Sequence, residues 1–241
     1  MSIIIYGKNA VRESVASGRA EKVKTLAKWG KDPIVAEARK RMIPVEFASE
    51  SELTRMARNP SHQGFAAICK DFSACPFEDF LSLGKKEPLL LMLDGIEDPH
   101  NMGAILRSAD AFGVDGVIIK KRGNAPLNAT VAKISTGAIN YVKVAEVANL
   151  SFAIKKLKEA GYWIVSSDGE AKASYDEVDY HCPICLIVGS EGFGISRLLL
   201  ENSDFVVKIP MHGHVNSLNA SVATGIFLSF ISHSRAKPLA D

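Results

Sequence analysis

Three polar loops in this 241-residue chain carry side chains of the kinds that take part in catalysis and ligand binding. Each loop directly follows an apolar run that we expect to form a buried strand. Ligands commonly collect at the carboxyl ends of parallel strands, so the position of these loops matters as much as their composition. The loops carry Asn101 and Arg107, then Glu191, and finally Ser217 and Asn219.

The second loop, GSEGFG at residues 189–194, contains three glycines around the carboxylate of Glu191. Glycine tolerates positive φ and leaves backbone N–H groups accessible, which suits a nucleotide-like ligand. The G-x-G-x-x-G order of dinucleotide-binding proteins is absent, and the loop stands late in the chain. This argues against a nucleotide-binding oxidoreductase.

Structural roles for the same residues remain open on these observations alone. A helix is expected to start near Asn101, and Ser217 and Asn219 open the final helix, so all three could cap helices. Arg107 could be a surface cation.

Two residue pairs could suggest a metal site. Cys182 and Cys185 flank the dipeptide Pro-Ile, and His212 and His214 stand two apart in a glycine turn. Neither pair has further ligands at a suitable spacing, and four cysteines do not make a disulfide framework at this chain length. We therefore expect no metal.

From residue 88 onward, apolar runs alternate with helical patterns. Continuous apolar runs are typical of parallel strands that are covered by helices on both faces. The chain therefore predicts an α/β domain with an open, doubly wound sheet over residues 88–241. Its expected strands are LLLMLDG, VDGVIIK, YVKVAEV, YWIVSSD, ICLIVG and FVVKIP.

Residues 1–72 repeat this alternation on a smaller scale and predict a small α/β domain with a mostly parallel sheet. Residues 73–87 contain a proline, a glycine and mixed charges without a sustained strand, and we interpret them as a linker. The expected strands of the small domain are residues 3–6, 23–26, 45–47 and 64–69, and its expected helices are residues 10–16, 33–42 and 52–57.

The positive charge of the chain is concentrated in its N-terminal part. Residues 1–75 hold 13 basic and 8 acidic side chains, whereas residues 76–241 hold 16 and 19. Such a surplus favours a polyanion such as nucleic acid as partner, although a solvated charged face would give the same count.

The sequence indicates a cytoplasmic protein. Its longest apolar stretches, residues 88–93 and 223–231, are shorter than the ~18–20 residues that a membrane span requires. The first residues lack the positive region and cleavage site of a secretory signal.

Three blocks occur in order between residues 98 and 229: DPHNMGAILRSA, IVGSEGFGISRLLLENSDFVVKIPM and VNSLNASVATGIFLS. They resemble the three signature motifs of the SpoU (TrmH) class of RNA 2′-O-ribose methyltransferases, within the SPOUT superfamily. The resemblance covers about residues 88–234. The N-terminal part, with YGKNAVRE and HQGFAAI, is similar to the ribosomal-protein-like RNA-binding domain of 23S rRNA (guanosine-2′-O-)-methyltransferases of the RlmB type.

The resemblance implies an enzyme that uses S-adenosylmethionine (AdoMet) and has a deep trefoil knot in its C-terminal domain. General rules of chain topology would reject such a threaded connection. In relatives, the backbone around three matching positions encloses the adenosyl part of the cofactor. The expected cofactor-binding residues are therefore Gly189, Ile209 and Leu218.

The resemblance also assigns roles to the polar residues in methyl transfer to a ribose 2′-hydroxyl. Arg107 would activate the hydroxyl, and Asn101 would place the substrate ribose. A guanidinium stays protonated below pH ~12, so Arg107 is either a base in an unusual environment or a clamp on a substrate phosphate. The remaining residues, Glu191, Ser217 and Asn219, would organise the site.

RNA is the implied partner, and the N-terminal extension favours a guanosine of 23S rRNA. A tRNA guanosine is the alternative substrate, and a non-catalytic RNA-binding module is the alternative function. The presence of all five polar residues argues against the module, since a decayed site would not retain every one.

The final helix predicts a homodimer formed through the C-terminal domain. Its apolar residues lie on two faces, and one sheet cannot cover both, so a second subunit is the expected cover. Relatives are dimers with active sites near the interface, which agrees with this expectation. One face carries Leu218, Val222, Ile226 and Phe230, and the other carries Ala220, Ala223 and Phe227.

Overall fold

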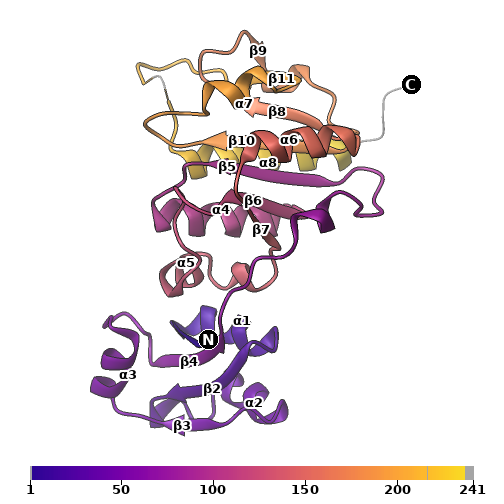
Figure 1. The fold of residues 1–241 in the computed structure, drawn as a ribbon. Coiled ribbons are helices and arrows are strands. Elements are labelled where there is room, and N and C mark those ends of the chain that lie inside the picture. Colours follow the sequence, from indigo (N-terminus) through magenta and orange to yellow (C-terminus); the bar gives the residue numbers. More distant parts are fainter. Residues whose placement is uncertain (1, 216, 237–241) are drawn as a thin grey trace. The chain divides into compact units, whose positions relative to one another are not determined.

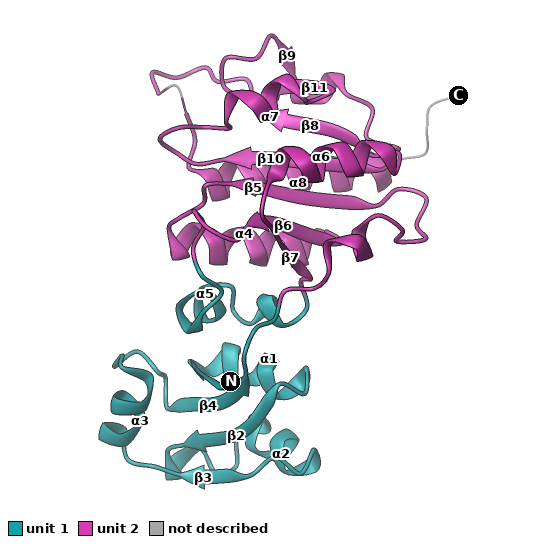
Figure 2. Cartoon of the chain, viewed as in Figure 1, with its two compact units in different colours: residues 1–73, 126–141 teal, residues 74–125, 142–241 magenta. Residues whose placement is uncertain are grey.

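A computed structural model describes residues 2–215 and 217–236. Its elements, drawn in Figure 1, form the two compact units of Figure 2. Unit 1 consists of Met1–Ser73 and Pro126–Tyr141, and unit 2 of Ala74–Ala125 and Val142–Asp241. Residues 126–141, called the inserted segment below, fall within the C-terminal domain by the sequence-based boundaries, but their contacts group them with the N-terminal residues.

Unit 1 contains the small α/β domain that the sequence predicts, and the inserted segment adds one α-helix and one 3₁₀ helix. Its elements are β1 (Ser2–Tyr6), α1 (Lys8–Ala16), β2 (Ala20–Thr25), η1 (Ala27–Trp29), α2 (Pro33–Lys40), β3 (Val45–Phe47), α3 (Glu50–Ala57), β4 (Phe65–Lys70), α5 (Ala129–Ile134) and η3 (Ala138–Asn140).

The sheet of unit 1 has the order β1-β4-β2-β3 and is mixed. Strand β4 pairs antiparallel with both β1 and β2, while β2 and β3 are parallel. The prediction of a mostly parallel sheet is therefore wrong. The chain reverses after α3, where Arg58, Gln63 and Gly64 adopt positive φ, and β4 then runs back between β1 and β2. Alternating helices and strands do not encode that reversal.

The inserted segment is held to the rest of unit 1 by polar contacts. The Lys133 ammonium donates to the Ser61 carbonyl at 3.0 Å and lies 5.0 Å from the ring centre of Tyr6. The Tyr141 hydroxyl donates to the Glu13 carboxylate at 2.8 Å. These contacts make the segment part of the small domain.

Unit 2 has a seven-stranded sheet with the order β7-β6-β5-β10-β8-β11-β9, and all its strand pairs are parallel. The predicted parallel α/β sheet is confirmed. The elements are η2 (Phe77–Phe80), β5 (Leu89–Asp94), α4 (Pro99–Ala111), β6 (Gly116–Lys120), β7 (Val144–Val147), α6 (Leu150–Glu159), β8 (Trp163–Ser167), β9 (Ala173–Ser174), η4 (Tyr175–Glu177), β10 (Ile184–Gly189), α7 (Arg197–Glu201), β11 (Phe205–Lys208) and α8 (Ala220–Ala236).

Both faces of this sheet are buried at its central strands β5 and β10. Successive side chains of a strand point to opposite faces, and Leu90, Leu91, Met92 and Leu93 of β5 are all fully buried. Helix α4 packs against α8, and α6 packs against α7. The trefoil knot implied by the family resemblance stays a prediction.

The predicted linker, residues 73–87, contributes a side chain to the core of unit 2. Phe80 is fully buried, and a Cβ atom on Gly116 would lie 2.2 Å from its ring. The Tyr162 hydroxyl donates to the Phe80 carbonyl at 2.8 Å. Burial raises the pKa of Tyr162 to about 12, so this hydroxyl stays protonated and able to donate at neutral pH.

The end of α8 is fixed by the guanidinium of Arg235. Its three nitrogens donate to the carbonyls of Tyr180, Glu87 and Cys182, each at 2.8 Å. Helix α8 has 17 residues, the most of any described helix. Within the described residues, no helix is both long enough and apolar enough to pass through a membrane.

Candidate functional site

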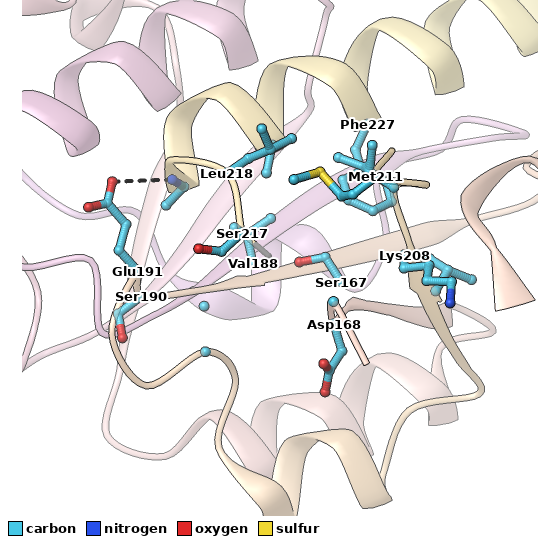
Figure 3. A pocket seen from close by; sticks show the side chains of 17 residues that line it. Ser167, Asp168, Val188, Ser190, Glu191, Lys208, Met211, Ser217, Leu218 and Phe227 are labelled. Atoms are coloured by element: carbon cyan, nitrogen blue, oxygen red, sulfur yellow. Dashed lines mark hydrogen bonds between the residues drawn. The ribbon is translucent and has the colours of Figure 1, made fainter. Parts of the chain in front are cut away.

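The three polar loops meet at the carboxylate of Glu191. Its Oε1 atom accepts a hydrogen bond from the Asn101 side-chain amide at 3.0 Å and another from the side-chain amide of Asn219. The Asn219 amide also donates to Oδ1 of Asn101 at 2.9 Å. The backbone N–H of Ala220 donates to the same Oε1 at 3.4 Å. A dashed line at the labelled Glu191 marks a hydrogen bond in Figure 3. Three of the five predicted catalytic residues thus form one polar cluster.

Asn219 is both a helix cap and a member of this cluster. Its Oδ1 accepts from the backbone N–H groups of Ser221 at 3.0 Å and Val222 at 3.3 Å, which closes the first turn of α8. Its NH₂ group faces Glu191 and Asn101 instead. The structural interpretation of Asn219 as a helix cap is therefore confirmed, and its role in catalysis stays a prediction.

A helix starts near Asn101 as expected, but Asn101 does not cap it. Helix α4 begins at Pro99, and the carboxylate of Asp98 caps it by accepting from the backbone N–H of His100 at 2.9 Å. Aspartate followed by proline is a strong start signal, because proline fits the first helical position. The Asn101 side chain is consequently released to bind Glu191.

The glycine loop is compact because Gly189 has no side chain. A Cβ atom there would lie 2.1 Å from the backbone carbon of Gly194 and 2.4 Å from the nitrogen of Ile195. Ser190 and Gly194 exchange two backbone hydrogen bonds, at 2.9 and 3.2 Å. Gly194 itself takes a φ of 64°. The loop therefore folds back tightly on the end of β10.

A pocket of about 170 Å³ opens at the carboxyl ends of β8, β10 and β11, which are neighbours in the sheet. Figure 3 shows its lining. The three predicted cofactor-binding residues, Gly189, Ile209 and Leu218, all line this pocket, together with Glu191 and Ser217. Residues from three separate stretches of the chain thus meet around one cavity.

Sequence reasoning missed the contribution of β8 to this pocket. Ser167 ends that strand, Asp168 and Gly169 follow it, and the three line the cavity with a hydroxyl, a carboxylate and a glycine backbone. The turn SSDG after an apolar run was the available signal, and it has the same character as the three loops identified above. Apolar walls come from Met211 and Phe227, among others.

Arg107 lies outside the polar cluster. Among the described residues, no hydrogen bond or ion pair joins it to Asn101, Glu191 or Asn219, and its side chain is exposed on α4. Six residues separate it from Asn101, which places the two side chains about 120° apart around a helix of 3.6 residues per turn. An incoming substrate can therefore reach the guanidinium directly.

The cysteines do not resemble metal ligands in their surroundings. Burial raises the pKa of Cys182 and of Cys185, and thiols rather than thiolates are then present at neutral pH. In the described part of the chain, no three His, Cys, Asp or Glu side chains come together as a metal site would require.

Comparison with known proteins places these observations in a family. The model of the SpoU rRNA Methylase family matches residues 88–229. This chain belongs to that family. A second model, described as RNA 2′-O ribose methyltransferase substrate binding, matches residues 4–74. The resemblance inferred from the three sequence blocks is confirmed.

Relatives in sequence and structure agree with this membership. A protein of Staphylococcus saprophyticus, named for the TrmH family of tRNA/rRNA methyltransferases, is 43% identical over 97% of this chain and 96% of its own. The AdoMet-bound rRNA methyltransferase from Sinorhizobium meliloti has a TM-score of 0.82 at 23% identity, over 98% of this chain and 88% of that one. The A. aeolicus TrmH/SpoU tRNA modifying enzyme has a TM-score of 0.58 at 31% identity, over 66% of this chain and 82% of that one.

Proposed function

We propose that this SpoU-family RNA methyltransferase transfers the methyl group of AdoMet to the 2′-hydroxyl of a guanosine ribose in 23S rRNA. One observation carries the proposal. The polar cluster of Asn101, Glu191 and Asn219 adjoins the pocket that contains all three predicted cofactor positions. Hydrogen-bonding groups next to a cavity that can enclose a nucleoside are what transfer to a ribose requires.

The pocket lining suits AdoMet. Leu218, Met211 and Phe227 offer apolar surface to an adenine ring, and the Asp168 carboxylate can accept hydrogen bonds from a ribose. When bound, AdoMet supplies a methyl group on a positively charged sulfur. The carboxylates of Asp168 and Glu191 favour a cation in this cavity.

The polar cluster is suited to align the bound nucleotide with AdoMet. Asn101 and Asn219 both bind Oε1 of Glu191, and no donor from the described residues reaches Oε2. That oxygen remains available to a donor on the bound nucleotide. Holding two reactants in line can supply a large part of a rate enhancement, and a carboxylate fixed by two amides is suited to such positioning.

Arg107 would act on the RNA. Its exposed guanidinium can bind a phosphate through two parallel N–H donors, which places the neighbouring ribose and stabilises developing negative charge. A role as base requires that binding strip its proton, and the phosphate clamp requires no such step. We therefore assign the clamp. As the methyl carbon bonds to the 2′-oxygen and leaves the sulfur, the hydroxyl proton can pass to Oε2 of Glu191, which no described donor reaches.

A groove on unit 1 supports RNA as the partner. The Lys8 ammonium pairs with Asp32 at 2.7 Å and lies 4.7 Å from the ring centre of Trp29, while that of Lys28 lies 5.8 Å from the same ring. Cations interleaved with an aromatic ring are typical of single-stranded nucleic acid binding. The groove, of about 590 Å³, is lined by residues that include Lys8, Asn9, Lys28, Trp29 and Gln63.

The N-terminal substrate-binding domain favours ribosomal RNA, and a guanosine of tRNA is the competing substrate. An enzyme that modifies ribosomal RNA works in the cytoplasm, and we propose that location. Comparing RNA from a deletion strain with wild-type RNA, by mapping ribose 2′-O-methylation, identifies the nucleotide. Loss of one 23S guanosine methylation is expected, and loss in a tRNA instead would overturn the rRNA assignment.

We also propose a homodimer through α8. Phe227 and Ala220 are buried within unit 2, whereas Val222 on the other face is 49% exposed. A shallow groove of about 470 Å³ runs along that face, and Val222, Ile226 and Phe230 line it. An apolar face of this kind fits a second copy of the helix.

Purified protein tests the catalytic assignment. Wild type should transfer labelled methyl from AdoMet to 23S rRNA of the deletion strain. Arg107→Ala should lower kcat by about 100- to 1,000-fold, the loss for removing one donor that stabilises developing negative charge, with AdoMet affinity retained. Arg107→Lys should fail as well, because an ammonium lacks the planar fork. Full activity in the lysine variant would exclude the bidentate clamp.

A further inference from the structure

Phe193 is an exposed aromatic side chain in the glycine loop. Its side chain is 97% exposed, more than any other large hydrophobic residue described. Single exposed apolar residues are common and need no explanation by themselves. This one stands between Gly192 and Gly194 in the loop that also carries Glu191.

The exposure of Phe193 is set by the fold. Its backbone N–H lies 3.4 Å from the Ser190 hydroxyl, and Ser190 and Gly194 exchange two backbone hydrogen bonds on either side of it. After the loop, the N–H of Ser196 donates at 2.9 Å to Asp94, a buried carboxylate at the end of β5. These hydrogen bonds fix the loop and keep the Phe193 ring exposed to solvent.

Phe193 borders a hollow next to the cofactor pocket. The hollow, of about 440 Å³, includes Asn101 of the polar cluster. It shares Ser190, Glu191 and Gly194 with the pocket at the ends of β8, β10 and β11. A nucleotide whose ribose approaches Glu191 would have space for its base in this hollow.

We infer that Phe193 is the stacking platform for the base of the nucleotide that is methylated, an inference that rests on the proposed function. Sequence-specific recognition of RNA commonly targets bases that are splayed out of the strand and stacked on aromatic side chains. A base held on a fixed ring would also hold its ribose, and with it the 2′-hydroxyl, next to the polar cluster. Phe193 is then a positioning residue for the acceptor.

The other walls of the hollow favour a base over the alternatives. Glu97 and Asp98 are exposed carboxylates, and they would repel a phosphate. Charged side chains are depleted in the cores of protein interfaces, so an apolar protein surface fits poorly here. Carboxylates accept hydrogen bonds and donate none, which suits a base edge that carries N–H groups.

Four variants test this inference in the full-length protein: Phe193→Ala, Phe193→Leu, Phe193→Trp and the control Phe152→Ala. Phe152 on α6 is 60% exposed in the same unit and lies outside the site. With 23S rRNA of the deletion strain, Phe193→Ala should raise KM about five- to 150-fold, the loss expected for one base stack. Phe193→Trp should restore KM, Phe193→Leu should not, and AdoMet affinity should stay at the wild-type value throughout.

The outcomes separate this inference from the proposed function. If wild type methylates no RNA, the proposed function fails. Quenching of Phe193→Trp fluorescence by the same rRNA, beyond the quenching of wild type with its own Trp29 and Trp163, then decides whether the ring meets a base. If wild type is active but Phe193→Ala has an unchanged KM, or Phe193→Leu works as well as Phe193→Trp, stacking is wrong. A fall in molecular mass of Phe193→Ala, measured by light scattering, would identify a subunit contact instead and would equally overturn the inference.

Discussion

Replacing Gly189 by alanine should close the predicted cofactor pocket at the wall that Gly189 forms. The new Cβ atom would lie 2.1 Å from the carbon, 2.2 Å from the oxygen of Gly194 and 2.4 Å from the nitrogen of Ile195. All three neighbours are backbone atoms, so no side chain can rotate out of the way. The loop that carries Glu191 must move instead.

The size of the effect follows from that geometry. Carbon atoms in contact normally lie ~3.5–4.0 Å apart, so the loop must shift by more than ~1 Å. Overpacking of this degree costs about 1–3 kcal/mol. If AdoMet binding requires the loop in its present position, the same free energy weakens the affinity about five- to 150-fold. The melting temperature should fall by roughly 2–12 °C, at ~2–4 °C per kcal/mol for a chain of this length.

Calorimetric titration with AdoMet measures the change, and Gly192→Ala is the matched control. Gly192 lies in the same loop, and a Cβ atom there would meet no atom within 4 Å. The control should bind AdoMet with wild-type affinity. Wild-type affinity of Gly189→Ala for AdoMet would show that this loop does not form a wall of the cofactor site.

Three further perturbations test other parts of the molecule. Arg235→Leu removes a charged donor from three carbonyls and should lower the free energy of unfolding by at least about 2 kcal/mol in urea titrations; an unchanged midpoint would contradict this. Lys28→Ala should weaken filter binding of 23S rRNA and reduce the slope of log affinity against log salt by about one; an unaltered salt series would remove Lys28 from the interface. Light scattering should give a mass of about twice 26.0 kDa for wild type and a lower mass for Val222→Asp. A wild-type mass of 26.0 kDa would refute the dimer.

The central strands of unit 2 could be predicted because burial on both faces leaves few polar positions in them. The runs LLLMLD of β5 and ICLIVG of β10 are apolar almost throughout, and the helices between them complete the parallel pattern. Asn101 and Glu191 follow the neighbouring strands β5 and β10, so the sheet brings their loops close together. Asn219 follows β11, which β8 separates from β10, and the sheet alone does not place it beside Glu191.

What could not be predicted depends on contacts between distant residues. The direction of β4 is set by a reversal at Arg58 and Gln63, and neither residue type requires positive φ. Asp168 stands in a short polar turn of a kind that many strands have, and its place in the pocket depends on β8 lying between β10 and β11. The attachment of the inserted segment to unit 1 rests on hydrogen bonds such as that from Tyr141 to Glu13, which no local sequence pattern predicts.

The inserted segment makes the small domain discontinuous along the chain, so the fold of this domain depends on two separate stretches of sequence. An engineer who exchanged residues 1–73 for the corresponding part of a relative would replace the stretch that holds Tyr6 and Glu13, the partners of Lys133 and Tyr141. A functional chimaera has to carry residues 126–141 along with the N-terminal stretch. The same coupling means that substitutions in these two stretches would be expected to change together as the enzyme acquires a new RNA.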